Sequence, residues 1–182
     1  MPARLLFCLI LLVAPIGVVA QDLAVLLKPG TIVVMRHALA PGTGDPKTFR
    51  IDDCSTQRNL DAEGRAQASK IGKRFRAAGV RFDHVWNSRW CRARDTAKLL
   101  DVGPPQDRKA LDSFFAHRDQ GAAQTAQTLE LIRALPHSDT AILVTHQVNI
   151  TALTGRRLRS GEIVVIERSG DGTLSVTDEI SF

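Results

Sequence analysis

Hydrophobic residues occur along the chain in short continuous runs that alternate with longer periodic segments. The short runs predict five strands, at residues 31–35, 82–87, 140–145, 162–167 and 174–178. The first and third runs are apolar or β-branched almost throughout, as is typical of strands that are covered on both faces. The last two are joined across residues 169–172, which contain two glycines, and this arrangement predicts an antiparallel hairpin.

Between these runs, apolar residues recur at the spacing of a helix that buries one face. They predict helices from Asp61 to Ala78 and over residues 92–100, 122–135 and 149–153. In the third helix we expect Ala126, Leu129 and Ile132 to face the core. Strands that alternate with helices predict an α/β fold of three layers, in which a mainly parallel sheet carries helices on both faces.

The first twenty residues have the pattern of a segment that directs export. Arg4 precedes an apolar run at residues 5–13, and small or modest side chains at residues 18–20 precede a cleavage point. We therefore predict a signal peptide over residues 1–20 and a periplasmic or secreted protein, with an uncleaved anchor as the alternative. Residues 21–182 are enough for a single domain and too few for two ordinary ones.

Two cysteines follow the predicted signal peptide, and exported proteins usually keep such a pair oxidised. We expect a disulfide between Cys54 and Cys91, with two unrelated thiols as the alternative. A metal site is disfavoured, because no cysteine or histidine pair has the usual ligand spacing. The formal net charge of +5 suits a phosphorylated small molecule or an envelope component as partner. Nucleic acid is disfavoured, because aromatic side chains that could stack bases are not interleaved with the basic residues.

Three of the predicted strands lead into polar residues that can carry phosphate chemistry. Arg36 and His37 follow the first strand, Ser88 and Arg92 follow the second, and His146 follows the third. The carboxyl ends of parallel strands meet at one edge of a sheet, so these residues are expected to converge. A histidine can attack phosphorus, and a guanidinium offers paired donors to phosphate oxygens. The arrangement predicts a phosphate pocket with a histidine nucleophile.

At these motifs the chain resembles the histidine phosphatase superfamily, the phosphoglycerate-mutase-like group, across residues 31–166. The residues that carry the resemblance are Arg36-His37-Ala38, Ser88, Arg92, Ala93, Thr96 and Thr145-His146. They are similar to the family's Arg-His-Gly signature, its Ser-x-x-x-Arg-Ala-x-x-Thr element and its second histidine. The resemblance implies that His37 is the nucleophile, that Arg36, Arg92 and His146 complete the phosphate pocket, and that no metal or organic cofactor is required.

The chain departs from the family pattern in two places. In many relatives a glutamate protonates the leaving group, but Ser113 occupies the corresponding place here. We expect Asp112 to act as the proton donor, with Asp119 and Glu130 as alternatives. If none serves, substrates with good leaving groups are favoured, because general acid catalysis is worth about 10² to 10⁴ in rate. Ala38 replaces the signature's glycine, which predicts a narrower pocket or a different turn.

Two further residues are predicted to contact phosphate. Ser88 begins the second motif, and Arg58 can reach the pocket from a long loop at residues 38–59. Pairing of Arg58 with Asp52 or Asp61 is the alternative. Loops of this length inside compact domains are usually functional, so we expect this loop to determine the substrate.

The leading functional prediction is an exported, metal-independent phosphomonoester hydrolase that works through a phosphohistidine. Its substrate would be a small or envelope-attached phosphate. Two alternatives remain, a phosphate-binding module without turnover and a phosphomutase, which would need longer insertions to protect its intermediate from water. Trp90, in the second motif, either lines the rim of the pocket or covers the disulfide.

Overall fold

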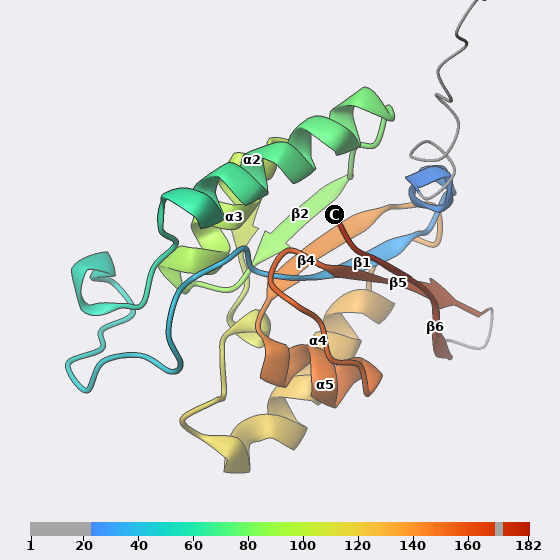
Figure 1. Cartoon of the computed structure of the whole chain (residues 1–182). Helices are drawn as coiled ribbons and strands as arrows, with labels where there is room; N and C mark the ends of the chain where they lie inside the picture. Colours follow the sequence, from blue (N-terminus) through green and yellow to red (C-terminus); the bar gives the residue numbers. More distant parts are fainter. Residues whose placement is uncertain (1–22, 170–172) are drawn as a thin grey trace, which may run out of the picture.

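A six-stranded sheet lies at the centre of the computed structural model, which describes residues 23–169 and 173–182 (Figure 1). The strands, in the spatial order β3-β2-β4-β1-β5-β6, are β1 (Ile32–Arg36), β2 (His84–Asn87), β3 (Pro105–Asp107), β4 (Ala141–Thr145), β5 (Ile163–Arg168) and β6 (Leu174–Ile180). The strands from β3 to β1 are parallel, whereas β5 and β6 pair antiparallel. The predicted sheet, mainly parallel and finished by a hairpin, is confirmed.

Helices cover both faces of the sheet (Figure 1). On one face lie α2 (Ala62–Ala77) and α3 (Cys91–Leu100), and on the other lie α4 (Gly121–Arg133) and α5 (Gln147–Thr154). Asp61 caps α2 as predicted, because its side chain accepts a hydrogen bond from the backbone N–H of Gly64. Short 3-10 helices lie at Ala24–Leu27, Cys54–Thr56, Lys109–Leu111 and Arg118–Gln120.

The two layers of core arise from the alternation of side chains along β1. Val33 and Met35 belong to the cluster that contains Phe75 of α2, whereas Ile32 and Val34 belong to the cluster under α4 and α5. All four β1 side chains are fully buried, because successive strand residues point to opposite faces. This explains why the continuous apolar run correctly predicts a strand covered on both sides.

Strand register brings the two histidines together. Arg36 at the end of β1 pairs with Thr145 at the end of β4, so the next residues, His37 and His146, leave the sheet side by side. The backbone N–H of Ser88, just after β2, bonds to the carbonyl of Val144 in β4. The ends of three strands therefore meet at one edge of the sheet.

The structure differs from the predicted local structure at one strand that was missed and at two elements whose details are wrong. Strand β3 was not predicted, because it begins with Pro105 at the sheet edge, where proline is tolerated but does not indicate a strand. In α4, Ala126 is exposed and Thr128 is buried instead, because the Thr128 hydroxyl donates to the carbonyl of Ala110. Phe82 and Asp83 precede β2 rather than belonging to it.

The predicted disulfide is present between Cys54 and Cys91, whose Cα atoms are 5.8 Å apart. It ties the loop before α2 to the first residue of α3, immediately before Arg92. A disulfide is characteristic of proteins outside the reducing cytoplasm. The predicted signal peptide lies outside the described residues, and within these residues the structure contains no helix with the length and apolar character of a membrane span.

We predict that Gly72→Ala destabilises the protein. A Cβ on Gly72 would lie 2.1 Å from the backbone carbonyl oxygen of Leu100, so α2 and α3 would have to separate. Helix propensity alone would make Gly72→Ala stabilising by about 1 kcal/mol. A loss of stability would therefore have to come from the close packing of the two helices. Thermal unfolding should show a lower Tm for Gly72→Ala, whereas Lys73→Ala on the exposed side should change stability by less than about 0.5 kcal/mol. A raised Tm for Gly72→Ala would contradict the close approach of the helices.

Candidate active site

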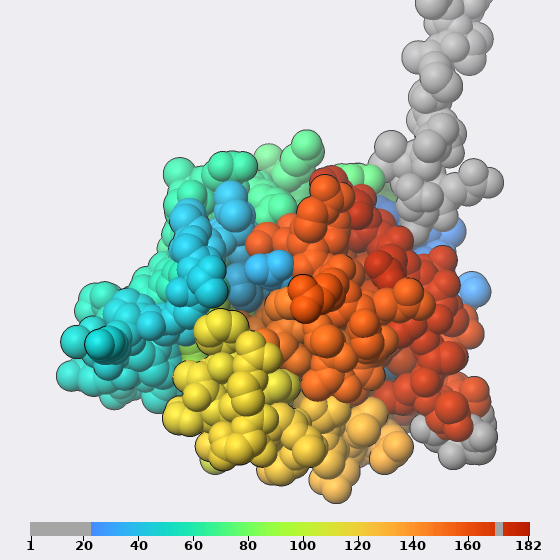
Figure 2. All heavy atoms as spheres, turned by 60° about the horizontal axis from the view of Figure 1, so that its bottom comes forward, coloured from blue at the N-terminus to red at the C-terminus, as the bar shows by residue number. Residues whose placement is uncertain are grey.

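A cavity of about 120 Å³ opens at the edge of the sheet where β1 and β4 end. Figure 2 views this face, where the loop after β1 (cyan), the segment before α4 (yellow) and α5 (orange) come together. The residues that line the cavity are Arg36, His37, Gly42, Thr43, Gly44, Asp45, Arg58, Arg92, Ser113, Phe115, His146, Gln147 and Val148. The two predicted histidines, His37 and His146, and the predicted arginines Arg36, Arg58 and Arg92 therefore line the same cavity.

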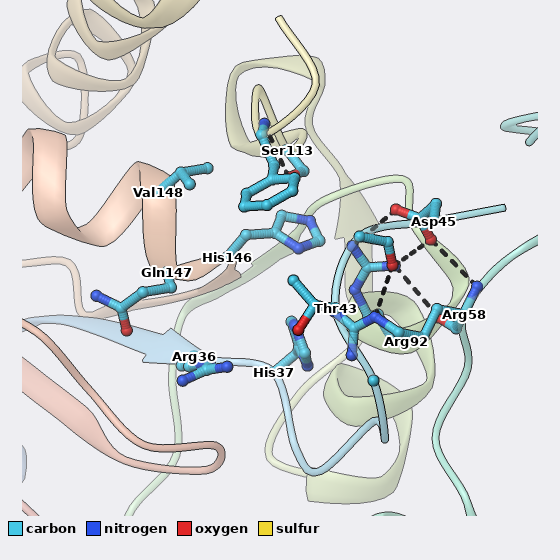
Figure 3. Close-up of a pocket in the computed structure, with 13 residues that line it drawn as sticks. Arg36, His37, Thr43, Asp45, Arg58, Arg92, Ser113, His146, Gln147 and Val148 are labelled. Atoms are coloured by element: carbon cyan, nitrogen blue, oxygen red, sulfur yellow. Dashed lines mark hydrogen bonds and ion pairs between the residues drawn. The ribbon is translucent and has the colours of Figure 1, made fainter. Parts of the chain in front are cut away.

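His37 presents one ring nitrogen to this cavity (Figure 3). Its Nδ1 lies 2.7 Å from the carbonyl oxygen of Ala38. A carbonyl only accepts hydrogen bonds, so Nδ1 carries the proton and Nε2 keeps a free lone pair. Burial, followed by the positive charge of Arg92, lowers the pKa of His37 to about 3. The imidazole is thus neutral at physiological pH, which a nucleophile requires.

Arg36 and Arg92 each have one edge held by the protein and Nε left unpartnered. Nη1 of Arg36 donates to the carbonyl of Leu158 at 2.8 Å. Nη1 and Nη2 of Arg92 bind the two carboxylate oxygens of Asp45 at 2.7 and 3.2 Å. In both residues Nε is buried and has no partner among the described residues. An edge with a free Nε–H suits an oxyanion, because a guanidinium binds phosphate oxygens through parallel donors.

His146 faces the cavity from the end of the neighbouring strand, β4. Its ring centroid lies 5.3 Å from that of His37, and its Nε2 is 2.8 Å from the hydroxyl oxygen of Ser88. Its Nδ1 is buried and has no partner among the described residues. The hydroxyl of Ser88 accepts from the backbone N–H of Trp90 and lies 3.4 Å from Oδ1 of Asp112 and 2.8 Å from Nε2 of His146. We assign its single proton to the shorter of the two contacts, so that it donates to His146. Nδ1 of His146 then carries a proton and can donate it to an anion in the cavity.

The electrostatics keep His146 neutral as well. Burial, followed by the charge of Arg92 and the proximity of His37, lowers the pKa of His146 well below its ordinary value. Burial also lowers the pKa of Arg36, helped by Arg92 and opposed by Glu162. The positive charge of Arg92 contributes to the lowered pKa of His37, His146 and Arg36. The cavity is therefore a site where an anion would be stabilised.

Asp45 is a site residue that the sequence analysis missed. Besides Arg92, its carboxylate accepts from the indole N–H of Trp90 at 3.0 Å and from the backbone N–H of Arg58 at 3.1 Å. Burial raises the pKa of Asp45, but the hydrogen bond and charge of Arg92 outweigh this and hold it below its ordinary value. Asp45 is therefore ionised, and it fixes Arg92 in the cavity. The only available signal was that a buried arginine needs an acidic partner.

Residues 32–114 match the family model of the histidine phosphatase superfamily (branch 1). A solved structure of the protein histidine phosphatase SixA, in complex with tungstate, is 13% identical and superposes with a TM-score of 0.66, covering 83% of this chain and 96% of that one. A phosphoserine phosphatase from Entamoeba histolytica, solved with 3-phosphoglyceric acid, is 13% identical with a TM-score of 0.60, covering 84% and 97%. A sequence search among functionally curated proteins finds no match.

Over residues 32–114 the chain is thus similar to the histidine phosphatase superfamily, and the solved structures show that the two share a fold. The match and the shared phosphoglycerate-mutase-like fold support phosphatase function in general, in a superfamily that also contains mutases. The family match includes Arg36, His37 and Arg92 but ends before His146. The structure supplies that second histidine by placing it beside His37.

Ser88 does not line the cavity. It is fully buried and lies behind His146, to which it is hydrogen-bonded. The predicted substrate contact is therefore corrected to a positioning role. Ala38 also differs from expectation, because its methyl group packs with Ala40, Leu60 and Ala68 instead of narrowing the cavity.

The geometry argues against Asp112 as the proton donor. Asp112 is buried and does not line the cavity. Its carboxylate instead accepts from the backbone N–H of Arg89 at 2.9 Å and forms an ion pair with the Arg89 guanidinium at 2.6 Å. The alternatives Asp119 and Glu130 do not line the cavity either, and Ser113 does. Asp45 is thus the only carboxylate on the described cavity wall, and it is bound to Arg92.

Arg58 lies at the cavity as predicted, but loop carbonyls hold it in place. Its Nε donates to the carbonyl of Gly44 at 2.8 Å, and its Nη1 donates to the carbonyl of Ala40. It pairs with neither Asp52, which lies beside Arg50, nor Asp61, which caps α2. Burial, followed by the charge of Arg92, lowers the pKa of Arg58 to about 10, so it remains a cation at physiological pH.

We predict that acid destabilises the ligand-free protein well above the pH at which carboxylates titrate. Between pH 6.5 and 5 the unfolded chain protonates His37 while the folded protein, with a His37 pKa of about 3, does not. Linkage then lowers the free energy of unfolding by about 2 kcal/mol for this residue, and His146 acts in the same direction. Urea unfolding at the two pH values measures the loss. His37→Gln should reduce it, and equal stability at both pH values would contradict burial of neutral imidazoles.

We predict that Asp112→Asn weakens the fold rather than removing an acid catalyst. The ion pair with Arg89 is lost, which should lower the free energy of unfolding by about 1–3 kcal/mol. Arg89→Ala should cost a similar amount, and the double variant should be less destabilised than the sum. Asp119→Asn, at an exposed carboxylate, serves as the control. A proton donor would behave differently, because its removal would abolish the alkaline limb of the pH–rate profile.

Proposed function

We propose that this protein is an exported, metal-independent phosphomonoester hydrolase that works through a phosphohistidine at His37. The observation that carries the proposal is a set of three buried N–H groups on cavity residues that lack partners among the described residues. They are Nε of Arg36, Nε of Arg92 and Nδ1 of His146. Unsatisfied buried donors are costly, so their convergence indicates a site that an anion with several oxygens would complete.

The first chemical step is attack on the phosphate ester. The Nε2 lone pair of His37 forms a bond to phosphorus while the bond from phosphorus to the ester oxygen breaks, and the electron pair leaves with that oxygen. The leaving oxygen then takes a proton from solvent. His37 is suited to this role because Ala38 binds its other nitrogen and burial keeps the ring unprotonated.

The second step returns the enzyme to its starting state. Water attacks the phosphoryl group, and the bond between phosphorus and Nε2 breaks with its electron pair returning to the nitrogen. Inorganic phosphate leaves with one of the water protons, and the other passes to solvent, which replaces the proton taken up by the leaving oxygen in the first step. Arg36, Arg92 and Arg58 surround the phosphoryl oxygens in both steps and stabilise their charge in the transition state. His146 adds a donor through Nδ1.

Charge neutralisation by three guanidiniums is the physical reason for proposing metal independence. Among residues 23–169 and 173–182, no group of three or more histidine, cysteine or acidic side chains is arranged to hold a metal ion. Export is supported by the Cys54–Cys91 disulfide, and we propose that the apolar run at residues 5–13 is the core of a signal peptide. A small or envelope-attached phosphate is then the accessible substrate.

A phosphate-binding module without turnover is the second candidate. It is favoured by one observation, that the cavity wall in the described part of the chain carries no carboxylate free to protonate a leaving group. Such a module would use the same arginines to bind phosphate but would not transfer the phosphoryl group to His37.

Phosphoryl transfer to His37 distinguishes the two candidates. The protein is incubated with 4-nitrophenyl phosphate and excess chelator, quenched rapidly in alkali and analysed by peptide mass spectrometry. We expect continued turnover and one added phosphoryl group on the peptide that contains His37. His37→Ala should abolish both, with a loss of at least about 10³ in kcat, while Arg157→Ala, an exposed arginine away from the cavity, should retain both. Binding of phosphate without a labelled His37 would establish the binding module instead.

A further inference from the structure

A second, larger cavity adjoins the cavity that is lined by His37 and His146, which we call the phosphate cavity. It has a volume of about 420 Å³, and its lining residues are Asp45, Pro46, Lys47, Phe49, Trp90, Ser113, Phe115, Ala116 and His117. Asp45, Ser113 and Phe115 line both cavities, so the two share a wall. A phosphomonoester with its phosphoryl group beside His37 therefore has this second cavity as the adjoining space for its leaving group.

Aromatic side chains form the walls of the second cavity. Phe49 and Trp90 are stacked, with ring centroids 4.9 Å apart and planes inclined by 22°. Phe115 is one of two large hydrophobic side chains that are exposed in the described part of the chain, with 44% of its surface accessible. Phe49 and Trp90 are half-buried and cover one face of each other, and the Arg118 guanidinium lies 4.8 Å from the centroid of the Phe115 ring. The parts of the three rings that these contacts leave open line the cavity, and an open aromatic face can bind a flat aromatic group by stacking. Trp90 lines this second cavity and is not among the residues that line the phosphate cavity, so the rim expectation is met only for the neighbouring cavity.

The walls are held in place by the same residues that build the phosphate cavity. The indole N–H of Trp90 donates to Asp45, whose carboxylate also binds Arg92. The neighbouring Cys91 is bridged to Cys54. A rigid aromatic wall therefore has a fixed position relative to the phosphoryl group, which is the condition for selecting a leaving group by shape.

The chemistry of the phosphate cavity independently limits the leaving group. Asp45 is the only carboxylate on its described wall and is held ionised by Arg92, so no carboxylic acid is available to protonate a departing oxygen. Ser113 can donate a hydrogen bond but cannot supply a proton at neutral pH. An alkoxide leaves poorly under these conditions. A phenolate, whose conjugate acid has a pKa of about 10, leaves without general acid help.

From these two observations we infer that the second cavity holds an aromatic leaving group and that the substrates are aryl phosphates, the phosphate esters of phenols. This inference rests on the proposed phosphatase function and specifies its substrate class. In the transfer step the bond from phosphorus to the phenolic oxygen breaks, its electron pair stays on that oxygen, and the phenolate takes a proton from solvent. The aromatic ring occupies the space bounded by Phe49, Trp90 and Phe115.

Stacking and leaving-group chemistry are tested separately. Phosphonates contain a carbon–phosphorus bond that this chemistry does not break, so their inhibition constants report binding alone. We expect phenylphosphonate to bind about tenfold tighter than cyclohexylphosphonate, which has similar size but is not flat. Phe49→Ala should reduce this ratio to nearly one, and Phe49→Tyr should restore it. Leu27→Ala, at an exposed leucine far along the chain from the site, is the matched control and should leave the ratio unchanged.

Turnover provides the second measurement. For the unmodified protein, kcat for phenyl phosphate should exceed kcat for cyclohexyl phosphate by at least about 10². The pH dependence of kcat for phenyl phosphate should lack the alkaline limb of a carboxylic acid donor.

The outcomes separate this inference from the proposed function. If both phosphates are hydrolysed equally well, or if cyclohexylphosphonate or a long-chain alkylphosphonate binds as tightly as phenylphosphonate, the aryl specificity is wrong while the phosphatase stands. If neither the phosphonates nor inorganic phosphate binds, the proposed function itself is wrong. Tight binding of the alkyl-chain compound would identify the cavity as a site for lipid phosphates.

Discussion

The ion pair between Arg92 and Asp45 is the interaction on which the rest of the site depends. Arg92 is only 3% exposed, and a buried guanidinium is stable only where a partner compensates its lost hydration. Asp45 supplies that partner and at the same time organises Trp90 and the backbone of Arg58. One carboxylate thus connects the loop after β1, the start of α3 and both cavities. It also leaves Nε of Arg92 free for an anion.

The positive charge that this pair helps to hold determines the state of the histidines. Arg92 contributes to the lowered pKa of both His37 and His146, after the larger effect of burial. Two neutral imidazoles can then serve different purposes, because their hydrogen-bond partners differ. The carbonyl of Ala38 leaves His37 with a free lone pair, whereas the hydroxyl of Ser88 leaves His146 with a free N–H. The protein obtains a nucleophile and a donor from the same side-chain type.

The described wall of the phosphate cavity has no carboxylic acid that is free to protonate a leaving group, because its carboxylate, Asp45, binds Arg92. Ser113 borders both the phosphate cavity and the aromatic one. The nearby carboxylate, Asp112, is used to hold Arg89 instead. A site that binds phosphate strongly but cannot protonate an alcohol imposes its selectivity through the leaving group. The aromatic cavity is located where that selectivity can be exercised.

The sequence alone was enough to predict the layers of the fold and the histidines and arginines that line the cavity. A short continuous apolar run such as Ile32 to Met35 is typical of a strand covered on both faces, and polar residues directly after such a strand are expected at the carboxyl edge of a parallel sheet. The pairing of Cys54 with Cys91 was also predictable, because they are the two cysteines outside the predicted signal peptide. Strand β3 escaped prediction because a proline begins it at the sheet edge.

The partner of each polar side chain near the site became known from the three-dimensional contacts alone. Asp45 and Asp112 are both aspartates in segments without regular periodicity, and nothing local distinguishes the one at the cavity from the one that binds Arg89. Ser88 changed from a substrate contact to a support for His146 for the same reason. Periodicity reports which face of an element is buried, but the partner of a loop side chain depends on contacts between residues distant in the chain, which no local pattern encodes.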